Sequence, residues 1–168
     1  VKGLVSCLSV ERSEVYDSWL RVGACLHNIN GSLLANWESY SRLYSAYADG
    51  TSKRSCSVKW KSFDNYNGEK LGIGSLVFWA SEDNGVRFKK VKMESVESLV
   101  DNSVKKGSDA DYLIAKVIHK YFCDEYISVD VRNEWFHFNG TRWERTLEGN
   151  LLRTAVHNEI YNLYYEYQ

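Results

Sequence analysis

Apolar side chains recur at steps of three and four through the first half of the chain, the spacing that gathers them on one face of a helix. The first stripe lies between Ser13, which can cap a helix start, and Asn30-Gly31, which can end one. Ser32 can cap the second helix. Because the predicted helices are short, each must bury its stripe against the others, so residues 1–83 predict a small helical bundle domain. The four stripes are Val15, Trp19, Val22, Leu26 and Ile29; Leu33, Trp37, Tyr40 and Tyr44; Cys56, Trp60 and Phe63; and Leu76, Trp79 and Ala80.

The pattern breaks at Asn84-Gly85, and a basic stretch follows. Val96, Leu99 and Val100 can then lie on one side of an amphipathic helix that ends before Lys106-Gly107. We interpret residues 84–107 as a linker with one possible helix.

Residues 108–168 show a different pattern. Ser108 or Asp109 can cap a first helix, and β-branched and aromatic residues at 126–131 and 135–138 then predict two strands joined by a turn at Arg132-Asn133. Asn139-Gly140 predicts a tight hairpin with positive φ at both turn positions, followed by a returning strand through Thr141, Trp143 and Arg145.

A final helix is predicted from about Leu147 to Gln168, with its apolar stripe at Leu151, Leu152, Val156, Ile160 and Leu163. It reaches the last residue without Gly, Pro or another stop signal. Val1 is not an initiator Met. We therefore expect a longer parent polypeptide and a domain over 108–168 that is truncated at its C-terminal end. The predicted fold class is α+β, mainly α: a small helical bundle, then a helix, a short antiparallel β-meander and a long C-terminal helix.

The charge balance limits how the chain could bind nucleic acid. It has 21 basic and 22 acidic residues and a net charge of −1, whereas phosphate-binding proteins usually carry a basic excess. A contact with DNA would need a local patch, although basic residues are commonly just a solvated surface. The candidate contacts are Lys53, Arg54, Lys59, Lys61, Arg87, Lys89, Lys90 and Lys92, together with the aromatic Trp143.

The large apolar residues are predicted first as core. With 44% hydrophobic and 14% aromatic residues, 168 residues can bury a core, or two small ones. Exposed indoles can also stack on nucleobases, and this alternative applies most to Trp135 and Trp143, which flank the predicted hairpin. The predicted core residues are Trp19, Leu26, Trp37, Trp60, Phe63, Trp79, Trp135 and Phe138.

The sequence lacks the residue patterns that several kinds of catalytic and metal sites require. The four Cys and four His are scattered, so we expect no metal site and reduced, buried thiols. A helicase motor needs a glycine-rich phosphate loop with lysine, and the segment at 72–75 (GIGS) lacks both the lysine and the length. A primase site needs clustered carboxylates for two metals. Asp109 and Asp111 instead fit the start of a helix. We expect no apolar run that could cross a membrane.

Two segments resemble known families. Residues 16–27 (YDSWLRVGACLH), 37–41 (WESYS), 60–63 (WKSF) and 73–80 (IGSLVFWA) resemble, in order and spacing, the accessory domain at the C-terminal side of archaeo-eukaryotic-type primases. The likeness covers residues 4–82. Between Tyr44 and Cys56 the family usually has a Lys-aromatic pair followed by acidic residues, and this chain has 45–48 (SAYA) and Lys53-Arg54 instead.

Residues 109–168 are similar to the region that precedes the motor in poxvirus-like superfamily III helicases of large nucleocytoplasmic DNA viruses. The matching pieces are 111–117 (DYLIAKV), 135–143 (WFHFNGTRW) and 151–153 (LLR), with Thr141 where the pattern often has His.

The tandem resemblance implies a non-catalytic linker and accessory region of a viral DNA primase–helicase. The implied partners are the primase and helicase domains of the same polypeptide, DNA, and further copies in a hexamer of the parent. The fragment itself is expected to need no cofactor, with ATP and Mg²⁺ bound by the rest of the parent. The implied location is inside an infected host cell, in a cytoplasmic viral factory or the nucleus. Two alternatives stay open: a nucleic-acid-binding module for single-stranded or forked DNA, and a stand-alone enzyme with an unrecognised site.

Overall fold

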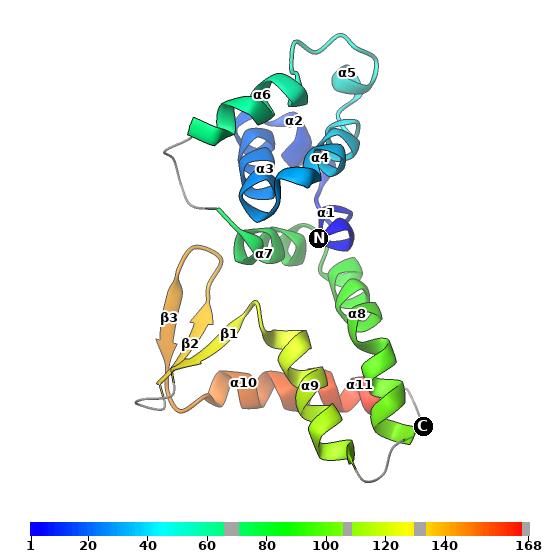
Figure 1. The fold of residues 1–168 in the computed structure, drawn as a ribbon, viewed down its shortest axis with the longest axis vertical. Helices are drawn as coiled ribbons and strands as arrows, with labels where there is room; N and C mark the ends of the chain where they lie inside the picture. Colours follow the sequence, from blue (N-terminus) through cyan, green and yellow to red (C-terminus); the bar gives the residue numbers. More distant parts are fainter. Residues whose placement is uncertain (66–70, 106–108, 130–133, 166–168) are drawn as a thin grey trace. The chain divides into compact units, whose positions relative to one another are not determined.

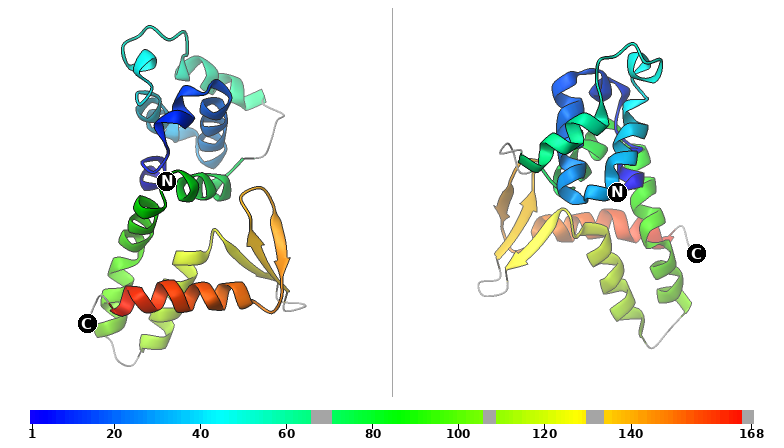
Figure 2. Two further views of the ribbon diagram at one scale, coloured as in Figure 1. Left: turned by 180° about the vertical axis from the view of Figure 1, so that it is seen from behind. Right: turned by 45° about the horizontal axis from the view of Figure 1, so that its top comes forward.

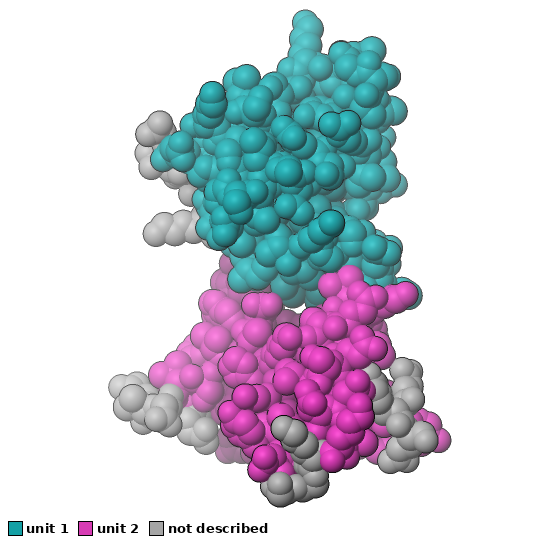
Figure 3. All heavy atoms as spheres, turned by 45° about the vertical axis from the view of Figure 1, so that its right-hand side comes forward, with its two compact units in different colours: residues 1–88 teal, residues 89–168 magenta. Residues whose placement is uncertain are grey.

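The chain forms two compact units, residues 1–88 and 89–168 (Figure 3). The computed structural model describes residues 1–65, 71–105, 109–129 and 134–165 (Figure 1). The predicted class, α+β with mainly α content, is confirmed. The boundary between the units falls within α8 (Gly85–Lys105), and each unit has its own hydrophobic core.

The first unit is a bundle of short helices around α3. Its central helix is apolar where it contacts α4, α6 and α7, and Trp19, Val22 and Leu26 have no exposed surface. Besides the start of α8, the described elements of this unit are α1 (Lys2–Val5), α2 (Val10–Glu14), α3 (Tyr16–Ile29), η1 (Gly31–Leu33), α4 (Leu34–Ser41), α5 (Ser45–Ala48), α6 (Cys56–Ser62), η2 (Phe63–Asn65) and α7 (Ile73–Asp83).

Two tryptophans at the centre of this bundle are stacked on each other. The ring centroids of Trp19 and Trp37 lie 4.6 Å apart, and the Trp19 indole N–H donates to the Ser41 hydroxyl at 2.7 Å. The close approach of Trp37 to α3 depends on Gly23, because a Cβ at that position would lie 2.3 Å from the Trp37 ring. The indoles therefore fill the core with their polar N–H groups satisfied.

An ion pair joins the α2 and α7 segments. The guanidinium of Arg12 donates through Nε to Asp83 Oδ2 at 2.7 Å and through a terminal nitrogen to Oδ1 at 2.6 Å. The backbone N–H of Ser9 donates to the same carboxylate at 2.9 Å, and the guanidinium lies 5.3 Å from the Trp79 ring centroid. Burial by itself raises the pKa of Asp83, but these hydrogen bonds and the charge of Arg12 outweigh it and lower the pKa below its usual value.

The predicted helix caps were wrong in two places. Ser13 lies inside α2, where it is buried and donates to the Val10 carbonyl, and α3 begins after the extended residue Val15 with no side-chain cap. Ser9 is the residue that caps α2. At the next break the Asn30 side chain accepts from the Ser32 N–H, so Asn30 rather than Ser32 acts as the cap. The sequence analysis did not predict α2, and the presence of this helix shifts the start of α3 to Tyr16.

The second unit packs helices on one face of a small antiparallel sheet. Its sheet has the strand order β1-β2-β3. A C-terminal helical segment follows the strands. Figure 2 shows this segment as one continuous helix, which contains a π-helical turn. Besides most of α8, the described elements of this unit are α9 (Ala110–Phe122), β1 (Tyr126–Val129), β2 (Glu134–Phe138), β3 (Trp143–Thr146), α10 (Asn150–Ala155), the π-helical turn η5 (Val156–Ile160) and α11 (Tyr161–Tyr165).

The segment that we predicted as a linker contributes to the core of this unit. Val96 and Val100 on α8 have no exposed surface and belong to the same core as Val117 on α9 and Ile160 of η5. The hydroxyl groups of Ser103 and Tyr164 lie 2.7 Å apart. The amphipathic stripe expected within residues 84–107 thus forms as a helix, and its apolar face is buried rather than left along a free connection.

The predicted hairpin at Asn139-Gly140 is present, but its turn is longer than the two-residue form. Phe138 pairs with Trp143, so residues 139–142 form the loop and Thr141 lies outside the returning strand. Gly140 has φ 94°, whereas Asn139 is not among the positive-φ residues of the described chain. Its side chain instead accepts from the N–H groups of Thr141 and Arg142, an Asx-type turn. The expected turn at 132–133 and the strand residue Val131 lie outside the described residues.

The last helix begins later than predicted. It starts at Asn150, after Gly149 in the left-handed region at φ 68°, and Leu147 is 83% exposed. Leu147 therefore belongs to the connection that precedes the helix.

Candidate functional site

A groove in the first unit brings together three of the predicted DNA-contact residues. It encloses about 490 Å³, within the range of small-ligand sites, and Lys53, Arg54 and Lys59 line it. None of its lining residues is a carboxylate, so the groove is locally cationic although the chain is nearly neutral. The other lining residues are Tyr16, Trp19, Ser52, Ser55 and Val58.

Arg54 forms the inner wall of the groove and is fixed by neutral partners. Its guanidinium donates to the carbonyl oxygens of Ser13, at 2.6 Å, and Glu14, which lie at the end of α2. It also lies 5.5 Å from the ring centroid of Tyr16 and 4.7 Å from that of Tyr44. Carbonyl oxygens and rings satisfy its donors without cancelling its charge. Arg54 therefore keeps a positive charge in the wall while its side chain is held in place.

Lys53 and Lys59 supply the accessible charges. Lys53 is exposed in the loop before α6, and Lys59 is half-buried on α6. Within the part of the chain that the structure describes, neither ammonium group forms an ion pair. Two hydroxyl groups hold the loop: Ser52 accepts from the Arg54 N–H, and Ser55 caps α6 by accepting from the Val58 N–H.

Tyr16 was missed by the sequence analysis. It occupies the first turn of α3, directly after the exposed Val15, and it is 41% exposed. The polar neighbours Asp17 and Ser18 give a weak signal that this end of the helix faces solvent. The lining of the groove depends on the loop at 52–55 returning to α3, which no local pattern reveals.

The remaining basic candidates do not line this groove. Lys61 is exposed on α6, and Lys89 and Lys90 are exposed on α8. Arg87 donates through Nε to the Ser6 hydroxyl at 3.0 Å. Lys92 is directed inward: its ammonium group lies 2.6 Å from a carboxylate oxygen of Glu125 and 3.9 Å from the Tyr121 ring centroid. Lys92 thus stabilises the second unit, and its charge is already paired.

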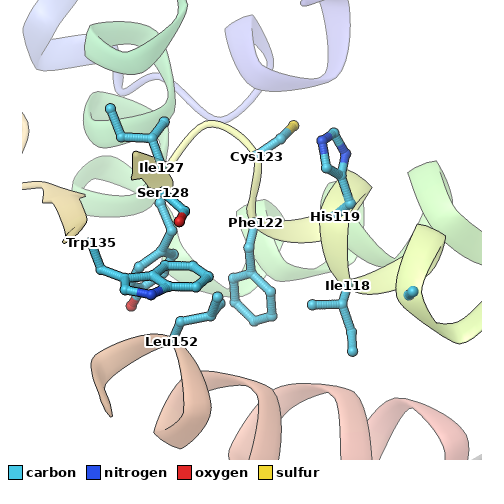
Figure 4. Close-up of a pocket in the computed structure, with 10 residues that line it drawn as sticks. Ile118, His119, Phe122, Cys123, Ile127, Ser128, Trp135 and Leu152 are labelled. Carbon is cyan, nitrogen blue, oxygen red and sulfur yellow. The ribbon is translucent and has the colours of Figure 1, made fainter. Parts of the chain in front are cut away.

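The second unit contains an apolar cavity of about 490 Å³. Figure 4 shows Phe122, Trp135 and Leu152 with their side chains directed toward one another from α9, β2 and α10. His119 and Cys123 are among the few polar groups in its lining. The lining is mainly apolar, so the surface suits an apolar side chain.

The outer face of the sheet carries the predicted contact Trp143. Directly paired residues share a face, so Phe138 and Trp143 lie together, with ring centroids 5.2 Å apart. Ile127 pairs with Phe136 on this same face. Trp143 is 40% exposed and lies on the face opposite Trp135, although Ile127 of its own face also lines the cavity.

Most of the predicted core residues are buried, and two are partly exposed. Trp135 and Phe138 are only half-buried: Trp135 lines the cavity, and Phe138 packs against the exposed Trp143. Trp135 also supports the turn into α10, where a Cβ on Gly149 would lie 3.1 Å from its ring. The buried members of the predicted set are Trp19, Leu26, Trp37, Trp60, Phe63 and Trp79.

The cysteines differ in accessibility. Burial raises the pKa of Cys25 to about 12, and burial also raises the pKa of Cys7 and Cys56. Cys123 is exposed, contrary to the expectation that all four thiols are buried. Among the described residues, no three His, Cys, Asp or Glu side chains come together as a metal site, and no helix is both long and apolar enough to span a bilayer.

Comparison with known families identifies the domain that makes up most of the first unit. Residues 1–80 match the family described as Primase C terminal 2 (PriCT-2). Residues 1–80 are therefore a primase C-terminal domain. The PriCT-2 domain coincides with the helical bundle from α1 to most of α7, and it includes the cationic groove.

The relatives of the whole chain are named as helicases of large DNA viruses. A protein of Acanthamoeba polyphaga mimivirus named "Putative helicase L207/L206" is 27% identical over 165 residues, which is 97% of this chain and 16% of that protein. "Putative helicase 184R" of Invertebrate iridescent virus 6 is 30% identical over 162 residues, 85% of this chain and 16% of that protein. A protein of Invertebrate iridescent virus 3, "Putative helicase 121R", is 26% identical over 152 residues, covering 84% of this chain and 16% of its own length. The chain thus spans about 16% of these relatives and continues past the PriCT-2 domain into the second unit in the alignments.

Proposed function

We propose that this chain is a non-catalytic linker and accessory region of a viral DNA replication primase–helicase. In this role the PriCT-2 domain and the second unit couple a primase to an ATP-dependent helicase motor in the same polypeptide. ATP and Mg²⁺ are then bound by other parts of the parent polypeptide. The second unit would support the assembly of the parent into a hexamer.

One observation supports this proposal most strongly. A primase-type domain over residues 1–80 stands in a chain that aligns over 97% of its length with a protein named as a helicase. A primase domain and a helicase name within one alignment favour a polypeptide that contains both activities. The separate cores of the two units are compatible with a region that connects a primase to a helicase motor.

The coupling is tested in the full-length parent by loosening the connection between the units. Six Gly and Ser residues inserted between Lys89 and Lys90, both exposed on α8, interrupt that helix while leaving the buried residues of both cores unchanged. We expect unwinding and primer synthesis, each measured alone, to stay within about twofold. Primer synthesis that depends on unwinding of a fork should fall about tenfold, because a flexible insert lowers the effective concentration of one activity at the product of the other.

The matched control carries the same insert between Leu147 and Glu148, both exposed in the connection between β3 and α10 inside the second unit. It should leave fork-dependent priming unchanged. Equal priming by both insertion variants and the wild type would contradict the coupling role. ATP hydrolysis or nucleotide polymerisation by the purified 168 residues would contradict the non-catalytic role separately.

A further inference from the structure

The cationic groove of the first unit, defined by Tyr16, Lys53, Arg54 and Lys59, has the composition of a nucleotide site. We infer that it binds one nucleotide unit, with the phosphate between Lys53 and Lys59 and the base on the exposed part of Tyr16. This inference adds a ligand to the proposed coupling role and does not depend on it. Its failure would leave the coupling role standing.

The charges in the groove favour a phosphate. Lys53 and Lys59 have no carboxylate partner among the described residues, and Arg54 is held by carbonyl oxygens and aromatic rings. Three cations that line one cavity without an anion repel one another, so an anionic ligand between them lowers the electrostatic free energy. A phosphate oxygen accepts hydrogen bonds from ammonium groups without needing a fixed donor geometry, which suits flexible lysines.

The aromatic wall favours a base beside the phosphate. Tyr16 is 41% exposed, and its ring is backed by Arg54 at 5.5 Å and tilted against Trp19 at a centroid distance of 5.5 Å. Because Arg54 and Trp19 hold this partly exposed ring in place, stacking a base on its exposed part costs little side-chain entropy. Arg54 acts here as a positioning residue: it holds the Tyr16 ring and adds charge without being displaced from its carbonyl partners.

Local hydrogen bonds keep the loop that carries Lys53 in one conformation. The Ser52 N–H donates to the Ala46 carbonyl at 2.6 Å, and Asp49 accepts from the N–H and the hydroxyl of Thr51. The serine hydroxyl groups at positions 52 and 55 are occupied by the turn and by the start of α6. The groove therefore presents two lysine ammonium groups and an aromatic ring, which match the phosphate and the base of a nucleotide.

Fluorescence anisotropy of a labelled oligo(dT) of about 12 nucleotides with the whole 168-residue protein, measured across a salt series, tests the site. For Lys53→Gln/Lys59→Gln we expect weaker binding and a slope of log affinity against log salt that is smaller by about 0.7, since the two lysines share one phosphate and each single-strand phosphate contact contributes about 0.7. Lys89→Gln/Lys90→Gln is the matched control, because it removes the same charge from exposed positions on α8 and should leave the slope unchanged.

Two variants of Tyr16 separate stacking from charge. Tyr16→Phe keeps the ring and should bind within about twofold of the wild type. Tyr16→Ala should weaken binding about tenfold with the salt slope unchanged. Equal losses in these two variants would contradict base stacking, and so would an unchanged affinity in Tyr16→Ala.

Competition identifies the source of the nucleotide unit. If ATP or dTTP displaces the oligonucleotide and its own binding is weakened by the same lysine variants, the groove takes a free nucleotide. If only oligonucleotides compete, it takes a nucleotide within a single strand. Absence of oligonucleotide and nucleotide binding at low salt, or equal weakening by the Lys89→Gln/Lys90→Gln control, would overturn the inference.

Discussion

At the scale of single residues, the packing of the PriCT-2 domain depends on positions that carry no recognisable motif. Gly23 lies in the middle of α3, where glycine is unfavourable by about 1 kcal/mol relative to alanine. Its presence is explained by Trp37, whose ring occupies the space that a Cβ would need. The close contact between α3 and α4 thus requires a residue of low helix propensity at this position.

Gly23→Ala should therefore destabilise the chain despite the better helix propensity of alanine. A Cβ at 2.3 Å from the Trp37 ring forces the indole or the helix to move, and we expect the free energy of unfolding to fall by about 3 kcal/mol. Gly31→Ala is the control, because a Cβ there meets nothing within 4 Å and should change stability by less than about 0.5 kcal/mol. Urea unfolding followed by tryptophan fluorescence measures both. Equal stability of the two variants would rule out this packing role for Gly23.

At the scale of elements, the α2 and α7 segments are joined by the pair of Arg12 and Asp83, and this contact should make stability depend on pH. The pKa of Asp83 is lowered in the folded protein, so the contact stabilises the fold at neutral pH and its contribution is lost as pH falls through that lowered pKa. The loss occurs below about pH 4, since the usual value is 3.8. An acid-side decrease in stability is the expected signature.

Asp83→Asn should lower the free energy of unfolding at pH 7 by about 1–3 kcal/mol, because Arg12 then loses a charged acceptor. The difference from the wild type should be smaller at pH 3 than at pH 7, because the contribution begins to be lost as pH falls below the usual pKa of 3.8. Glu82→Gln, at the exposed neighbouring position, is the control and should have a much smaller effect. Denaturant titrations at both pH values measure these differences, and a gap that stays constant with pH would mean that the carboxylate charge is unimportant.

The π-helical turn shows how an element can adapt to its own apolar spacing. Leu152, Val156 and Ile160 follow two successive steps of four, and each such step turns an α-helix about 40° past a full revolution. The wider turn of η5 takes up this drift, so that these residues and Leu163 all pack on the same core. The spacing predicted a helix, but its winding depended on what it packs against.

At the scale of the whole molecule, two separate cores imply that damage to one unit should remain local. Val100→Ala removes two methyl groups from a fully buried position of the second core, and about 2 kcal/mol of stability should be lost there. Val104→Ala, on the same helix and 60% exposed, is the control and should be nearly neutral.

Hydrogen exchange distinguishes the units in this experiment. Amides of α9 and α11 should lose protection in Val100→Ala, while those of α3 keep theirs, because the residues around α3 belong to the other core. An equal loss in α3 would mean that the two units unfold as one cooperative body.

The order and type of the main elements were contained in the sequence, because apolar spacing reports which face of a helix or strand must leave water. The stripe through Trp19, Val22 and Leu26 and the hairpin signal at Asn139-Gly140 were both readable in this way. Matching residues also carried the resemblance to a primase C-terminal domain, which the comparison with residues 1–80 confirms.

Tertiary structure decided what depends on residues distant in the chain. The cap at Ser9, the burial of Val96 and Val100 and the inward direction of Lys92 all depend on partners that no local window contains. The groove is the clearest case, since Tyr16 on α3 and Lys53 before α6 become neighbours only when the bundle closes. Local spacing determines which surfaces an element must bury, whereas a binding surface depends on the side chains that folding brings to its rim.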